Sequence, residues 1–146
     1  VLSSSTIDAY ENTSQGTGDL FVEDVSGGPW TLTNQNAWMR QINPETTSSP
    51  RILNHGGNLW MLGYKTEDQG VIVESTNGGQ TELIGAFLLE GDFGSIPAFI
   101  NNESSLSFVS ANHRSFDGDE VTIGIRETRG GVTRTTDGLP PYYTGF

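Results

Sequence analysis

Short stretches of this chain carry apolar residues at every second position, and each stretch follows a pair of small residues. In "ILNHGGNLWMLGYKTE" (52–67), Leu59 and Met61 occupy such positions between Gly56-Gly57 and Gly63. A period of two residues is typical of a β-strand with one buried face, whereas an amphipathic helix needs apolar residues at i, i+3, i+4 and i+7. No part of the chain offers the helical spacing, so the pattern predicts strands.

The small pairs recur along the chain. Their first members are separated by 29, 22, 26 and 26 residues, and the pairs are Gly27-Gly28, Gly56-Gly57, Gly78-Gly79, Ser104-Ser105 and Gly130-Gly131. A short apolar stretch precedes each pair. After each of the first four pairs, the residues at the second, fourth and sixth positions form a triplet. In chain order the four triplets are Trp30, Leu32 and Asn34; Leu59, Met61 and Gly63; Thr81, Leu83 and Gly85; and Ser107, Val109 and Ala111. Self-similarity at such a spacing indicates a repeat architecture.

The repeat predicts a β-solenoid of about five short coils, in which each coil buries its apolar face only by stacking on its neighbours. Gly63 and Gly85 are expected to stack at corresponding corners, where positive φ is cheap for glycine, with Ala111 in the next coil. The residues expected to point into the core are Leu59, Met61, Leu83 and Val109. An antiparallel β-sandwich also has short strands and glycine turns, and it is the alternative.

The coils are expected over residues 18–136. Residues 1–17 are polar and are expected to form a lead-in or partial cap, and residues 137–146 a carboxy-terminal tail. Since a first coil opening near Leu20 would expose strand edges, we expect the amino-terminal end to be covered by preceding coils or by a second protein chain. The start without Met suggests a processed chain or a piece of a longer one.

The net charge of the chain limits the classes of partner that it can bind. Seven Lys and Arg stand against eighteen Asp and Glu among 146 residues, for a net charge of -11. Such a field repels phosphate backbones and disfavours nucleic acid as a partner. No apolar run reaches the roughly 20 residues that cross a bilayer, so no membrane span is expected. The chain has no cysteine, which is compatible with an extracellular or cell-surface protein.

Five segments resemble the last coils of right-handed parallel β-helix proteins of the pectate-lyase-like superfamily, particularly its glycoside-hydrolase-28-related members. These segments are "LFVEDVSGGPWTLTNQNAWMRQINPE", "ILNHGGNLWMLGYKTE", "TNGGQTELIGAFL", "PAFINNESSLSF" and "IRETRGGVTR". The resemblance implies stacked parallel strands with polysaccharide bound along an outer groove. The hydrolase motifs of that superfamily are missing here, and "NHGG" (54–57) matches one of them only loosely. Any active site of a polysaccharide hydrolase or lyase is therefore expected mostly outside this chain.

Carbohydrate sites combine aromatic rings with charged and amide groups. Trp38 and Arg40 have this composition and are placed by the repeat in the longest excursion between coils, as part of "NQNAWMRQINPE" (34–45). The alternative is that Trp38 binds no ligand and simply covers the end or flank of the coil stack. Further candidates follow the corners at aligned positions: Tyr64, Lys65, His113 and Arg114. Lys65 and Arg114 would form a basic strip suited to uronate or sulfate groups, or would simply be solvated charges on turns.

Four acidic residues precede the small pairs and are weak candidates for a pair of catalytic carboxylates: Glu23, Asp24, Glu74 and Glu127. Glycoside hydrolysis needs two carboxyl groups about 5–10 Å apart, and in an acidic chain a chance arrangement competes with this interpretation. The two histidines lack zinc spacing, so no metal site is expected. The acidic "DGDE" (117–120) offers oxygen donors suited to calcium but lacks the calcium-loop pattern, and a turn is the better interpretation.

Two classes of function remain open. The first is an extracellular β-helix module that contacts polysaccharide, as the carboxy-terminal part of a hydrolase- or lyase-like protein. The second is a structural or assembly component, such as a surface, filament or tail-fibre protein that has no catalytic activity. The Trp38–Arg40 stretch favours the first, and the missing catalytic motifs favour the second.

Overall fold

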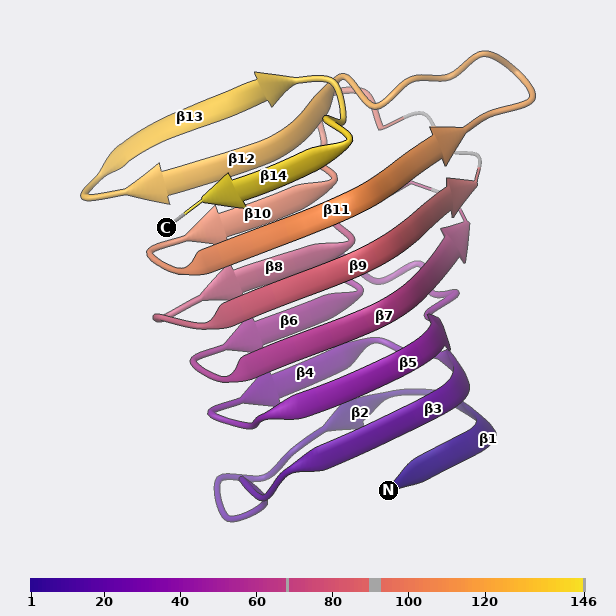
Figure 1. The fold of residues 1–146 in the computed structure, drawn as a ribbon, viewed down its shortest axis with the longest axis vertical. Helices are drawn as coiled ribbons and strands as arrows, with labels where there is room; N and C mark the ends of the chain where they lie inside the picture. Colours follow the sequence, from indigo (N-terminus) through magenta and orange to yellow (C-terminus); the bar gives the residue numbers. More distant parts are fainter. Residues whose placement is uncertain (68, 90–92, 146) are drawn as a thin grey trace.

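The computed structural model describes residues 1–67, 69–89 and 93–145, and within them the chain forms strands and no helix. The strands build a β-solenoid of about six turns. Each turn contributes one strand to a front sheet, crosses, and returns through a shorter strand in a back sheet (Figure 1). Because the front strands run rightward while the chain climbs, the solenoid is right-handed (Figure 1).

We call the two sheets the long-strand sheet and the short-strand sheet. In spatial order, the long-strand sheet contains β1 (Leu2–Ile7), β3 (Leu20–Gly27), β5 (Ala37–Asn43), β7 (Asn58–Glu67), β9 (Gln80–Leu89), β11 (Ser105–Arg114) and β14 (Tyr142–Gly145). The short-strand sheet contains β13 (Val132–Asp137), β12 (Ile123–Arg129), β10 (Phe99–Asn102), β8 (Val73–Thr76), β6 (Ile52–His55), β4 (Trp30–Thr33) and β2 (Tyr10–Glu11).

Neighbouring turns pair through parallel strands, which confirms the solenoid and does not favour the antiparallel sandwich. Residues 1–17 supply β1 and β2, which pair in parallel with β3 and β4. The polar segment expected as a lead-in therefore supplies a further turn, and the number of turns is about six rather than five. Residues 34–45, expected as an excursion between coils, contain the whole of a regular strand, β5.

The core lies between the two sheets. Leu59, Met61 and Leu83 are at most 3% exposed, as predicted from the period of two. Val109 was predicted to be buried as well, and this is wrong, since it is 45% exposed. Ser105 pairs with Gln80 rather than with Gly79, so the fourth repeat is displaced by one residue from the alignment on the small pairs. In a strand a slip of one residue reverses the faces, and the buried residue is Phe108.

A column of residues with positive φ runs along the long-strand sheet, one in each turn. Leu62 pairs with Ile84 and Tyr64 with Ala86, so Gly63 lies opposite Gly85 as predicted. The next member of the column is Ser110, with a φ of 59°, and not Ala111. The column consists of Ser4, Asp24, Gln41, Gly63, Gly85 and Ser110, with φ between 45° and 77°. This bend shifts the phase of each strand, which turns Tyr64 into the core.

The first small pair does not belong to the repeat. Trp30 and Leu32 lie in the short-strand sheet, where Trp30 pairs with Ile52, so Gly27-Gly28 is not equivalent to Gly56-Gly57. Thr33 pairs with His55, which makes Asn34, with a φ of 50°, the counterpart of Gly56. Asparagine tolerates the left-handed region nearly as glycine does, so a search for glycine pairs misses this corner.

The carboxy-terminal end of the solenoid is closed by two antiparallel strands. β13 pairs with β12, and β14 pairs with β11. Gly130-Gly131 forms the tight turn between β12 and β13 instead of a further corner. The expected tail at 137–146 contains β14, whose Tyr143 ring stacks on Phe108 at 5.8 Å between centroids.

Candidate functional site

The outer face of the long-strand sheet carries side chains stacked in ladders. Leu59 and Met61 point inward, so Trp60 and Leu62 point outward, and each has a counterpart on the neighbouring strands. The aromatic ladder consists of Phe21, Trp38 and Trp60, and it continues into Glu82 and Ser107. The second ladder consists of Glu23, Arg40, Leu62, Ile84 and Val109.

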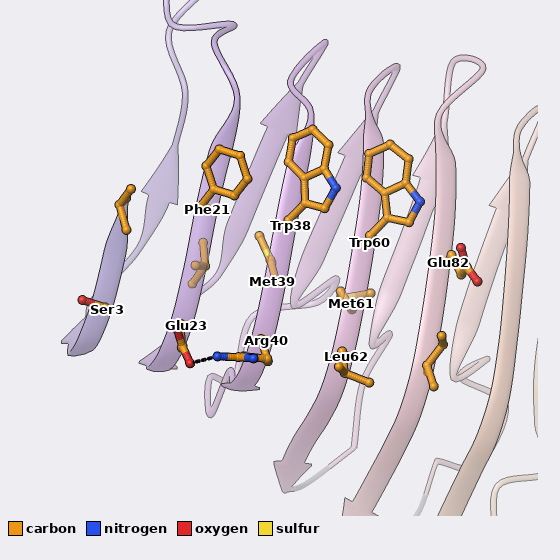
Figure 2. Close-up of a pocket in the computed structure, with 13 residues that line it drawn as sticks. Ser3, Phe21, Glu23, Trp38, Met39, Arg40, Trp60, Met61, Leu62 and Glu82 are labelled. Carbon is orange, nitrogen blue, oxygen red and sulfur yellow. Dashed lines mark hydrogen bonds and ion pairs between the residues drawn. The ribbon is translucent and has the colours of Figure 1, made fainter.

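The three rings of the aromatic ladder pack face to face. The Phe21 and Trp38 ring centroids are 5.1 Å apart with 13° between the ring planes, and those of Trp38 and Trp60 are 4.9 Å apart with 12°. Figure 2 shows the rings in a row across three adjacent strands. Both faces of Trp38 are therefore covered by neighbouring rings. Trp60 has a ring on one side only, because the next residue in the ladder is Glu82.

The two ladders enclose an apolar groove of about 390 Å³. Trp60 is 37% exposed, Phe21 48% and Leu62 53%, so the side chains that line the groove are accessible to solvent. Arg40 forms an ion pair with Glu23 at one end of the groove (Figure 2). Both side chains of the pair are at least half exposed, so it adds little stability, but it partly neutralises both charges.

A smaller hollow of about 180 Å³ lies on the side of Trp60 that faces Glu82. Polar groups surround it, and they come from three strands because β14 pairs with β11 and places Thr144 opposite Ser107. They belong to Gln80, Glu82, Ser105, Ser107 and Thr144. Thr81 also borders the hollow, but its hydroxyl is buried and bonds inward to Asn54 and Ser75. None of the residues that line the hollow is basic. The hollow thus combines an indole ring with hydroxyl, amide and carboxylate groups.

Of the residues proposed from sequence, Trp38 and Arg40 belong to these ladders, while Tyr64 does not. Tyr64 is 3% exposed and lies in the core, so its expected place on the surface flank is wrong. Burial raises the pKa of the Tyr64 phenol well above its ordinary value. The repeat predicts that the chain leaves the strand at Gly63, whereas β7 continues through Gly63 to Glu67.

The basic strip proposed from Lys65 and Arg114 is not formed. Lys65 is in register with Phe87 and Asn112, whereas Arg114 is in register with Leu89. Lys65 donates to the Glu67 carboxylate at 2.6 Å and to that of Glu45 at 3.3 Å, and the hydrogen bond to Glu67 raises the pKa of Lys65.

The other residues of that proposed set make local contacts. The Arg114 guanidinium lies 5.5 Å from the ring centroid of Phe116, and the His113 ring meets Phe93 edge-on at 5.8 Å.

The four candidate carboxylates do not share a face. Glu23 and Asp24 lie on β3 in the long-strand sheet, and Glu74 and Glu127 lie on β8 and β12 in the short-strand sheet. Glu127 accepts a hydrogen bond from the Asn101 amide at 3.1 Å and lies 3.6 Å from Arg129. Since the two sheets lie on opposite sides of the core, residues of one sheet cannot pair with those of the other for acid–base catalysis at a single bond.

Within the described residues, no group of three or more His, Cys, Asp or Glu side chains could hold a metal ion. "DGDE" (117–120) lies between β11 and β12. The described part of the chain contains no long apolar helix of the kind that could span a membrane.

Sequence reasoning missed Phe21, Trp60 and Glu82 as members of the site. The period of two already indicates that Trp60 points outward if Leu59 and Met61 point inward. What it does not give is the register between turns, which places Phe21, Trp38 and Trp60 in one row. Comparison of the chain with protein-family models, with curated proteins and with solved structures found no match.

Proposed function

We propose that this protein is a β-solenoid module that contacts polysaccharide, with the hollow beside Trp60 as the main subsite. The observation that carries the proposal is the pairing of an indole ring face with a ring of hydrogen-bonding groups. A sugar ring has an apolar face of C–H groups and an edge of hydroxyls, so it needs both kinds of contact. Sites for small ligands are mostly apolar and aromatic with a few placed polar groups, and this hollow follows that rule.

The proposal moves the binding role from Trp38 to Trp60. Stacking on a sugar needs a ring face, and the faces of Trp38 are covered by Phe21 and Trp60. Trp38 and Phe21 then act as supports: by packing behind Trp60, they hold its indole upright on the sheet. A rigid aromatic platform loses little side-chain entropy when a ligand binds.

The charge of the hollow favours a neutral glycan. Glu82 is the only charged residue among those that line it, and its carboxylate can accept hydrogen bonds from sugar hydroxyls. Uronate or sulfate groups would be repelled by this carboxylate and by the net charge of -11 on the chain. The acidic glycans suggested by the basic strip are therefore not part of the proposal.

Membership of the pectate-lyase-like superfamily and an extracellular or cell-surface location belong to the same proposal. Support comes from the right-handed parallel solenoid and from the outer groove, both of which the resemblance implies. The proposal is one of binding, and it gives no catalytic role to the four candidate carboxylates, which are divided between two sheets.

An array of neutral and acidic glycans, followed by titration calorimetry, tests the proposal. We expect saturable binding of a neutral glycan. Trp60→Ala is expected to weaken it about thirtyfold, which corresponds to the roughly 2 kcal/mol typical of truncating a central tryptophan. Val109→Ala serves as the control, because Val109 is 45% exposed on the same face but outside the hollow. Equal loss in both variants, or binding that survives in Trp60→Ala, would refute the assignment of the hollow.

The second candidate is a structural or assembly role, and the aliphatic part of the second ladder favours it. Leu62, Ile84 and Val109 are 53%, 43% and 45% exposed in adjacent strands, a pattern more suited to packing against protein than to binding sugar. If the folded wild-type protein binds none of the glycans on the array, that result would support this candidate.

A further inference from the structure

Glu82 is a carboxylate without a cation beside it. It follows Trp60 in the aromatic ladder, and it is the only charged residue among those that line the hollow. None of the ion pairs formed within the described part of the chain includes it. Arg40, which lies two strands away on β5, pairs with Glu23 instead. The hollow therefore presents a negative charge that no neighbouring side chain neutralises.

The open face of Trp60 and the Glu82 carboxylate border the same space. The rings of the aromatic ladder follow one another at 5.1 Å and 4.9 Å, close to the spacing of about 4.8 Å between strands. A further ring stacked on Trp60 would therefore lie over β9, the strand that carries Glu82 (Figure 2). The hollow of about 180 Å³ leaves room there, so substituents of such a ring would lie within reach of the carboxylate.

An ammonium group would use this space better than a hydroxyl group does. A hydroxyl can donate a hydrogen bond to the Glu82 carboxylate, but it carries no positive charge to pair with it. An ammonium group donates hydrogen bonds in which both partners are ionised, and these are among the stronger ones in proteins. A cation within about 6 Å of the centre of a tryptophan ring is also attracted by the electrons of the ring face.

We propose that the hollow beside Trp60 binds an amino sugar, with the sugar ring stacked on the indole and its ammonium group bonded to Glu82. This inference rests on the proposed function and extends the ligand from neutral glycans to glycans with free amino groups, which bind more tightly. The net charge of -11 attracts such polycations from a distance. Within the hollow, Gln80, Ser107 and Thr144 are left to bond the sugar hydroxyls.

A sugar fits the hollow better than the lysine side chain of a partner protein would. Both carry an ammonium group, but the lysine stem has no flat apolar face to cover the indole of Trp60. It also has no hydroxyl groups to meet the amide and hydroxyl groups around the hollow. The ring of polar groups therefore favours a ligand that is polar along its whole edge.

Titration calorimetry with three oligosaccharides of equal length tests the proposal. They are built from glucose, from N-acetylglucosamine and from glucosamine, so they differ in carrying a hydroxyl, an acetamide or an ammonium group at the same carbon. At low salt, and at a pH at which the amine is protonated, we expect the glucosamine oligomer to bind about tenfold more tightly than the other two. The preference should shrink as salt is added, because salt screens an exposed charge pair.

Glu82→Gln keeps the size of the side chain and its capacity to accept a hydrogen bond, but removes its charge. We expect this variant to bind the glucosamine oligomer no more tightly than the two neutral oligomers, whose affinities change little. Glu74→Gln is the control, because it removes the same charge from the short-strand sheet on the other side of the core, and it should keep the preference. Circular dichroism establishes that both variants are folded.

Two results would overturn the inference and leave the proposed function in place. In the first, neutral oligomers bind and depend on Trp60, but the amine adds no affinity. In the second, the preference for the amine survives in Glu82→Gln, and it then belongs to the net charge of the chain. A lysine oligomer that binds as tightly as the glucosamine oligomer, with the same dependence on Glu82, would overturn the assignment to a sugar. If the folded protein binds none of the three oligosaccharides, the proposed function fails and this inference fails with it.

Discussion

Adjacent residues on β9 should differ sharply in their contribution to stability. Leu83 is fully buried and lies in register with Met61 and Phe108, whereas Ile84 is 43% exposed on the outer face. Leu83→Ala removes three carbons, which gives about 2.4 kcal/mol at 0.8 kcal/mol for each buried methylene. The cavity adds to this, because neighbours anchored on both sides cannot collapse into it, so we expect a loss of roughly 2–5 kcal/mol in the free energy of unfolding.

Ile84→Ala is the matched variant, with the same kind of truncation one residue along the strand. Its expected cost is about 1 kcal/mol or less, as for a half-exposed strand position. Urea unfolding followed by tryptophan fluorescence and far-ultraviolet circular dichroism measures both variants. Equal costs for the two, or a larger cost for Ile84→Ala, would show that the strand faces are assigned in the wrong phase.

Two further perturbations examine the corner and the carboxy-terminal end. A Cβ on Gly57 would lie 2.1 Å from the Gln35 carbonyl oxygen, so Gly57→Ala should destabilise by about 1–3 kcal/mol or more, whereas Gly18→Ala, with no atom within 4 Å, should change the urea midpoint little. Burial and the Glu127 carboxylate raise the pKa of Tyr143 to about 12 from 10. The folded state thus favours the neutral phenol, so stability is complete below pH about 10 and falls as the pH rises toward about 12. Tyr143→Phe should reduce this fall in the urea midpoint, and an unchanged profile would contradict the assignment.

The strands and their stacking could be predicted because both depend on local pattern. Leu59, Met61 and Leu83 stand at alternate positions, and Gly63 and Gly85 mark the bends within β7 and β9 with a residue type for which positive φ costs least. These signals are contained within single turns. They predicted a β-solenoid and the buried positions of Leu59, Met61 and Leu83, and the structure agrees with both.

The sequence by itself therefore determined the class of fold and the inward positions of Leu59, Met61 and Leu83, and the tertiary structure decided which turns meet and where. The length of each turn varies, and Asn34 replaces glycine at one corner, so the register between turns cannot be read from spacing. An error of one residue in that register exchanged Val109 with Phe108, because strand faces alternate. The aromatic ladder also depends on the register between turns. Phe21, Trp38 and Trp60 are far apart in the chain, and only parallel pairing brings their rings into contact.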